Sequence, residues 1–240
     1  DVVMTVGSTL LRGGCVLMPS VPCGVTLDVI DALGRTLPSM GAAAPTIYVV
    51  SPVGPAAMSF LEIMVEWVNN ARRASSTGLM RDRYTPESPF LHYDMQESRR
   101  LQIVSDLHAL SGSYAEPCVV MAGHPSLRFG PALHFLRRWA GRPDSLLLLT
   151  DPLWNRIGGD EGVNLLRPHL PLKMRVKLAP LDPRLTPTQA LAALSEIGAP
   201  TAVVPVVMAT AAAGGGGGVV GRRWSCPGAP DMTRARDEWS

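Results

Sequence analysis

The chain has 240 residues, of which 46% are hydrophobic and 18% are charged, and its formal net charge is +2. This length can bury one or two hydrophobic cores. The near-neutral charge excludes a global electrostatic footprint for DNA or RNA, so any nucleic-acid surface has to be local.

The chain begins at Asp1 without a methionine and inside a helix-like pattern, so we expect the true N-terminus to be missing. Short apolar runs then predict strands, in chain order, over residues 15–18, 46–50, 118–121, 146–149, 175–178 and 202–207. Amphipathic stretches predict helices over residues 24–37, 56–70, 98–110, 132–139 and 188–197. Several strand runs are continuously apolar, as expected for strands covered on both faces. Strand–helix alternation predicts an α/β fold with a doubly wound, mostly parallel sheet.

Three further segments do not fit this alternation. Residues 69–89 are polar and predict a long exposed loop. Residues 201–220 are uncharged and long enough to cross a bilayer, but Pro205 and a glycine run interrupt them, so we expect no membrane partner. From residue 209 onward the Ala/Gly-rich composition predicts disorder.

The four cysteines are Cys15, Cys23, Cys118 and Cys226, and none belongs to a C-x-x-C pair. Three of them lie beside apolar, strand-like runs. We therefore expect buried free thiols, as in a reducing compartment.

The histidines outside the loops are dispersed along the chain, at His92, His108, His134 and His169. Their spacing matches no zinc motif, because a zinc site needs three or four ligands that converge on one point. We therefore predict no metal and no cofactor. Trp67 and Trp139 fall on apolar helical faces, which favours core packing over base stacking.

Three predicted strands run into Pro/Gly-rich loops, at residues 19–24, 51–55 and 123–130. In an open α/β sheet, ligands bind outside the carboxyl ends of the strands, and helix N-termini there can hold phosphate. The three loops could therefore face one crevice. For any single loop the default interpretation is an ordinary strand-to-helix turn, and none matches a P-loop, a G-x-G-x-x-G fingerprint or a G-x-S-x-G elbow.

The most polar of these loops contains His124, Ser126 and Arg128. As a set they could contact an RNA phosphate, with Arg128 as a fork and the other two as donors. As a nucleophilic set they fail, because no base is evidently spaced to activate Ser126. The favoured alternative is that His124 and Ser126 shape the turn before the helix that starts near Pro131.

Several of these stretches together resemble the β-CASP proteins, nucleases and relatives in which a cap domain is inserted into a metallo-β-lactamase fold. Residues 12–19 read RGGCVLMP, residues 46–53 read TIYVVSPV, and the helix at residues 60–67 follows. The most specific stretch is residues 117–130, PCVVMAGHPSLRFG, and residues 180–185, PLDPRL, add to it. The resemblance covers roughly residues 1–207, which is more than one motif.

The last two stretches are most similar to the noncatalytic branch of this family that belongs to the nuclear Integrator complex. The resemblance implies a subunit that forms a heterodimer with a catalytic β-CASP subunit, joins other Integrator subunits and takes part in small nuclear RNA 3′-end processing. It also implies a β-CASP domain over residues 1–141, truncated at its N-terminus. A returning metallo-β-lactamase segment over residues 142–208 and a disordered tail over residues 209–240 would follow.

Active members of the family bind zinc through histidines that the resemblance places at two positions of this chain. One position holds Asp182, and the other falls in residues 204–207, which contain no histidine. One carboxylate does not hold a metal, so the resemblance implies a degenerate metal site and a pseudo-nuclease that acts as a scaffold. Arg128 and Arg184 are the best candidates for phosphate contacts. Two alternatives stay open, an active zinc-dependent RNA endonuclease and a nucleotide-binding doubly wound enzyme.

Overall fold

The computed structural model describes residues 1–41, 45–67, 91–152, 154, 166–198, 201–203 and 223–225. The chain divides into two compact units, Asp1–Asp182 and Pro183–Ser240. In the described part of the chain, no helix is both long and apolar enough to cross a membrane.

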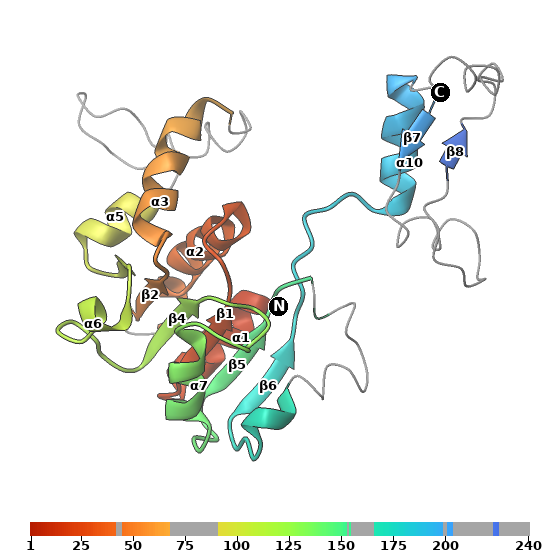
Figure 1. The fold of residues 1–240 in the computed structure, drawn as a ribbon. Helices are drawn as coiled ribbons and strands as arrows, with labels where there is room; N and C mark the ends of the chain where they lie inside the picture. Colours follow the sequence, from red (N-terminus) through yellow and green to blue (C-terminus); the bar gives the residue numbers. More distant parts are fainter. Residues whose placement is uncertain are drawn as a thin grey trace, which may run out of the picture. The chain divides into compact units, whose positions relative to one another are not determined.

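The first unit is built on one sheet of six parallel strands (Figure 1). In chain order the strands are β1 (Val16–Pro19), β2 (Thr46–Val50), β3 (Leu101–Val104), β4 (Cys118–Ala122), β5 (Leu146–Leu149) and β6 (Arg175–Leu178). Their order across the sheet is β3-β2-β4-β1-β5-β6, and every neighbouring pair is parallel. The predicted α/β class with a mostly parallel sheet is therefore confirmed.

Helices cover both faces of this sheet and connect its strands. They are α1 (Val2–Leu11), α2 (Gly24–Thr36), η1 (Pro38–Met40), α3 (Gly54–Ile63), η2 (Met64–Trp67), α5 (His92–Glu97), α6 (Leu107–Leu110), α7 (Ala132–Trp139) and η4 (Arg167–His169).

Alternation along each strand divides the core into two clusters. On β4, Val119 and Met121 pack with side chains of α1 and α2. Val120 and Ala122 point to the other face and pack with α7. Because successive strand residues face opposite sides, a continuously apolar strand is buried only where both faces are covered.

The central strands β1, β4 and β5 are buried along their whole length, as predicted for strands covered on both faces. The expectation does not extend to β6, an edge strand that pairs only with β5 and is largely exposed. There Lys177 donates to Asp1 and Thr5, while Val176 and Leu178 stay close to half exposed.

The prediction of one helix over residues 98–110 is wrong, because the structure has β3 and the short helix α6 there. β3 pairs with β2 as the other edge of the sheet. Ile103 and Val104 are β-branched, which favours a strand. Asp106 then begins α6, since its carboxylate accepts the backbone N–H groups of His108 and Ala109.

The prediction of core packing holds for Trp139 and is wrong for Trp67. Trp139 is fully buried under α7, whereas Trp67 ends η2 and is 81% exposed. Phe60 and Ile63 on α3 share this exposure. The apolar spacing therefore predicts the helix correctly, but Phe60, Ile63 and Trp67 are exposed, while Met58 of α3 is buried. The loop predicted over residues 69–89 lies outside the described residues.

The predicted domain division at residue 141 does not coincide with the division in the structure. β5 and β6 lie beyond residue 141, yet both belong to the same sheet, in which β5 pairs with β1 and β6 pairs with β5. The first unit ends at Asp182. Assignment of residues 142–208 to a metallo-β-lactamase segment stays a prediction.

The second unit contains α10 (Pro187–Ile197) and a two-stranded antiparallel sheet of β7 (Thr201–Val203) and β8 (Arg223–Ser225). A capping box of Thr186 and Gln189 begins α10, and Gly198 ends it at φ 68°. β8 falls inside the segment predicted to be disordered, so for these three residues the structure gives a strand instead. Residues 204–222 and 226–240 lie outside the described part.

Candidate functional site

Three loops leave the same edge of the sheet, as the sequence predicts. Pro19 of β1 and Val50 of β2 both lie opposite Ala122 at the carboxyl end of β4. The backbone N–H of Ser20 then donates to the Ala122 carbonyl at 3.1 Å. The chain therefore places residues 19–24, 51–55 and 123–130 at the edge where open α/β sheets bind ligands.

His124 and Ser126 contact each other directly in the loop after β4. The His124 Nδ1 atom lies 2.9 Å from the Ser126 hydroxyl and accepts the Ser126 backbone N–H at 3.1 Å. The contact places an imidazole beside Ser126, which the sequence spacing does not predict. However, two donors share the single lone pair of Nδ1, and no carboxylate among the described residues contacts the ring. The pair thus shapes the turn and lacks the third group that orients a nucleophile's base.

The loop closes tightly on its own beginning. Gly130 adopts φ 91°, and a Cβ atom there would lie 2.4 Å from the Gly123 carbonyl oxygen, so only glycine fits. The Ala132 N–H also donates to that carbonyl. Leu127 anchors the loop from inside, since it is 1% exposed in the core beneath α7.

Arg128 and Phe129 form the exposed tip of this loop. The Phe129 ring stacks on the His124 ring with centroids 4.8 Å apart, and Phe129 is 60% exposed. An exposed ring beside a guanidinium is the combination that holds single-stranded nucleic acid. Phe129 is not among the predicted site residues, although it lies next to Arg128 in the most specific stretch of the sequence.

The remaining predicted site residues lie elsewhere in the chain. Asp182 ends the first unit and is exposed. Arg184 is exposed and belongs to the second unit. The loop after β4 therefore carries His124, Ser126 and Arg128 in the first unit, and Arg184 belongs to the other unit.

Zinc is the metal that the family resemblance implies. Across the described ranges, no three His, Cys, Asp or Glu side chains converge on a point that could hold a metal ion. A zinc site requires three or four such ligands. This part of the chain therefore does not fit a zinc ion.

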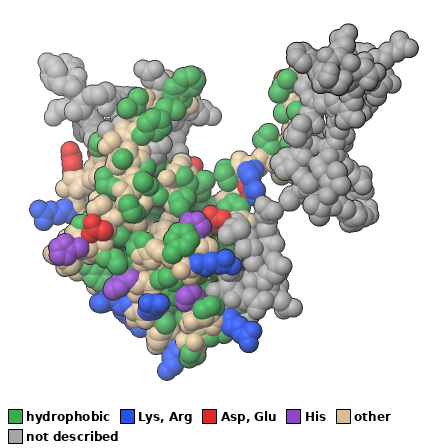
Figure 2. Space-filling model, viewed as in Figure 1, with side chains coloured by type: hydrophobic (Ala, Val, Ile, Leu, Met, Phe, Trp, Pro, Cys, Tyr) green, Lys and Arg blue, Asp and Glu red, His purple; other side chains and the backbone are tan. Residues whose placement is uncertain are grey.

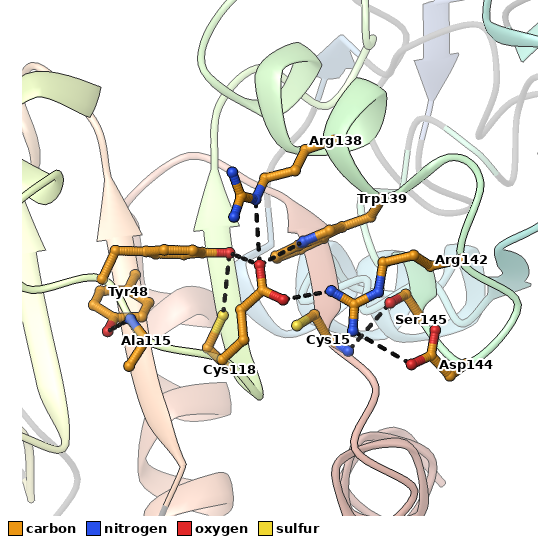
Figure 3. A network of polar contacts seen from close by, with 11 residues as sticks. Cys15, Tyr48, Ala115, Cys118, Arg138, Trp139, Arg142, Asp144 and Ser145 are labelled. Atoms are coloured by element: carbon orange, nitrogen blue, oxygen red, sulfur yellow. Dashed lines mark hydrogen bonds and ion pairs between the residues drawn. The ribbon is translucent and has the colours of Figure 1, made fainter.

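A second polar cluster lies at the opposite, amino end of β4 (Figure 3). The Glu116 carboxylate accepts a hydrogen bond from the Tyr114 hydroxyl at 2.7 Å and from the indole Nε1–H of buried Trp139 at 3.1 Å. It also pairs with Arg138 at 3.2 Å and with Arg142. Burial raises the pKa of Glu116, but the hydrogen bonds to the carboxylate outweigh burial and lower the pKa to about 2.

Two of the cysteines lie beside this cluster as buried free thiols, as predicted. Cys15 and Cys118 face each other across β1 and β4, since Val16 lies opposite Val119. The contact with Cys15, together with burial, raises the pKa of the Cys118 thiol. Cys23 does not follow the prediction, because it is exposed. Cys226 lies outside the described residues.

The parallel sheet with helices on both faces defines the class of the protein as an α/β domain. The Beta-Casp domain model matches residues 30–152, about half of the chain. The chain belongs to the Beta-Casp domain family.

Several curated relatives of this chain are Integrator complex subunit 9 proteins. The Nematostella vectensis homolog is 34% identical over 199 residues, which are 82% of this chain and 28% of the relative. The Homo sapiens protein is 31% identical over 190 residues, 79% of this chain and 27% of the relative. The Dictyostelium discoideum homolog is 28% identical over 200 residues, which are 83% of this chain and 26% of the relative. The chain thus spans little more than a quarter of the length of these curated relatives.

Proposed function

We propose that this chain is part of a noncatalytic subunit of the Integrator complex in the nucleus. It supports a paired β-CASP RNA endonuclease in small nuclear RNA 3′-end processing. The observation that carries the proposal is the similarity to Integrator complex subunit 9 proteins from three distant organisms over about four fifths of this chain.

The ligand chemistry of the described residues supports a noncatalytic role. Zinc-dependent hydrolysis needs a metal that activates water, held by converging ligands. Asp182 stands where the family resemblance places a zinc-binding histidine, and the described residues offer no group of three ligands. The role proposed for the chain is therefore scaffolding, with a contribution to the RNA path.

The loop after β4 is the proposed RNA contact. Arg128 supplies a guanidinium for phosphate, and the exposed Phe129 supplies a ring on which a base can stack. His124 and Ser126 hold the turn that presents both side chains. Arg184 is proposed as a second phosphate contact in the other unit.

Metal analysis of the purified full-length protein tests the noncatalytic role. The scaffold predicts no tightly held zinc, and two tightly held zinc ions per molecule would instead establish the active endonuclease. A thermal-shift series with nucleotides tests the remaining alternative, because saturable stabilisation of this chain would favour a nucleotide-binding enzyme.

Ultraviolet crosslinking of RNA to the assembled complex tests the proposed contact. We expect the double charge reversal Arg128→Glu and Arg184→Glu to reduce crosslinking to this subunit severalfold, because each reversal replaces a phosphate contact with repulsion. Arg99→Glu, at another exposed arginine, is the matched control and leaves crosslinking unchanged. Crosslinking that survives the double reversal removes both residues from the RNA path.

A further inference from the structure

An open groove of about 550 Å³ lies between α7 and the segment around η4. Its floor is aliphatic, formed by Leu133, Leu136 and Ala140 of the α7 region and by Leu170 after η4. Leu170 is 55% exposed, and Leu133 is partly buried against the core. Figure 2 shows the surrounding face, where Arg, Lys and His side chains gather with apolar side chains between them.

The rim of this groove is cationic. Arg128 and Arg137 line it, together with His169, and its described lining contains no carboxylate. Within the described ranges, neither Arg128 nor Arg137 has an ion-pair or hydrogen-bond partner. This differs from the neighbouring Arg138 and Arg142, whose guanidinium groups are both bound to Glu116.

The two walls of the groove are fixed to each other. The His169 Nε2–H donates to the Leu127 carbonyl at 3.0 Å, which ties η4 to the loop after β4. At the end of α7, the Ala140 carbonyl accepts backbone N–H groups from Lys173 at 2.7 Å and from Met174 at 3.2 Å. A groove held at both ends costs little ordering when a ligand enters it.

We propose that this groove binds an acidic segment of a partner protein. The segment places an aliphatic side chain on the floor and carboxylates on Arg128 and Arg137. Guanidinium forks match carboxylates in geometry and charge, and the aliphatic floor gives a buried anchor point.

The lining favours a protein segment over RNA. Bases are held by stacking on aromatic rings, and the described lining of the groove contains no Phe, Tyr or Trp. Its one described ring, that of His169, is held by the hydrogen bond to the Leu127 carbonyl. The exposed ring nearby, Phe129, stacks on His124 and is not among the lining residues. Arg128 is shared with the proposed RNA contact, so the experiment relies on Arg137 and Leu133.

Fluorescence anisotropy with the full chain tests the proposal. The probe is a short labelled peptide of Glu, Asp and Ser that carries two Leu residues. Two further peptides replace its Leu residues with Ser or its acidic residues with Lys. A single-stranded RNA oligonucleotide of equal charge competes against the probe. We expect saturable binding of the acidic Leu-containing peptide only. RNA should compete through the shared Arg128 alone, and therefore more weakly than unlabelled peptide does.

Variants locate this binding at the groove. We expect Arg137→Glu and Leu133→Ser each to weaken peptide binding at least about tenfold. The exposed Arg99→Glu should leave it within about twofold. Circular dichroism checks that each variant is folded. If Arg137→Glu or Leu133→Ser does not fold, peptide binding is measured with Arg137→Gln in its place. Binding that is absent, that ignores Arg137 and Leu133, or that RNA displaces as well as peptide does, overturns the proposal.

Discussion

The two ends of β4 carry the two polar clusters of the first unit, and they differ in how fully their charges are neutralised. At the amino end, Glu116 is surrounded by donors and is only 23% exposed. At the carboxyl end, Arg128 is exposed and has no ion-pair partner in the part of the chain that the structure describes. Removing one member of a partly buried charge cluster leaves its partners unpaired and destabilises the fold, whereas charges left toward solvent are available to ligands. We therefore expect substitutions at the amino end of the strand to change stability, and substitutions at the carboxyl end to change the proposed binding.

The largest expected effect is at the amino end. We expect Glu116→Ala to lower the free energy of unfolding by about 3 kcal/mol, because it leaves the buried Trp139 N–H and two arginines without their acceptor. Urea unfolding measures the change. Glu97→Ala, at an exposed helix end, is the control, and its free energy of unfolding should stay within about 0.5 kcal/mol of that of the original chain. An equal loss in both variants would contradict the role of the Glu116 cluster.

A related effect is expected from pH. The pKa of Glu116 falls from 4.5 in the unfolded chain to about 2 in the folded one. Its stabilising contribution is therefore fully present above pH 4.5 and is lost as the pH falls toward 2. Between pH 4.5 and pH 2, the free energy of unfolding should fall by about 2 kcal/mol more in the original chain than in Glu116→Gln, which has no carboxylate to protonate at this position. Urea unfolding at several pH values measures this difference. Parallel curves for the two proteins would refute the assignment.

The carboxyl end should respond more weakly. We expect His124→Ala to cost about 1 kcal/mol, since it removes the acceptor of the Ser126 backbone N–H and the stacking partner of Phe129. Thermal unfolding, followed by circular dichroism, measures the change. A decrease in the free energy of unfolding as large as that of Glu116→Ala would mean that this loop stabilises the fold as much as the Glu116 cluster does.

The smallest effect is expected at Arg128. Arg128→Ala should leave the free energy of unfolding within about 0.5 kcal/mol, because the side chain is exposed and pairs with no described residue. Calorimetry or urea unfolding checks this value. A loss above 2 kcal/mol would identify Arg128 as a structural residue and weaken its assignment to binding.

Much of the sheet could be predicted from the sequence, because β1, β2, β4 and β5 are apolar runs bounded by turn residues. β3 was missed, since its residues lie at the edge of the sheet and their spacing also suits a helix. Trp67 was misplaced for a related reason: periodicity reports an apolar face but not what covers that face.

The candidate site was predictable only in part. The loop with His124, Ser126 and Arg128 stands in one continuous stretch, so the sequence indicates it directly. The Glu116 cluster was not predictable, because its arginine partners lie 22 and 26 residues away and only α7 and the following turn bring them back. No local pattern encodes such a contact.

The central claim is that this chain belongs to a noncatalytic partner of a β-CASP endonuclease. Affinity purification of the tagged full-length protein from nuclei tests it most directly, with the co-purified proteins quantified by mass spectrometry. We expect a catalytic β-CASP subunit to be recovered with it in about one-to-one amount. Recovery of the full-length protein without any such subunit, under conditions that retain other nuclear complexes, would contradict it.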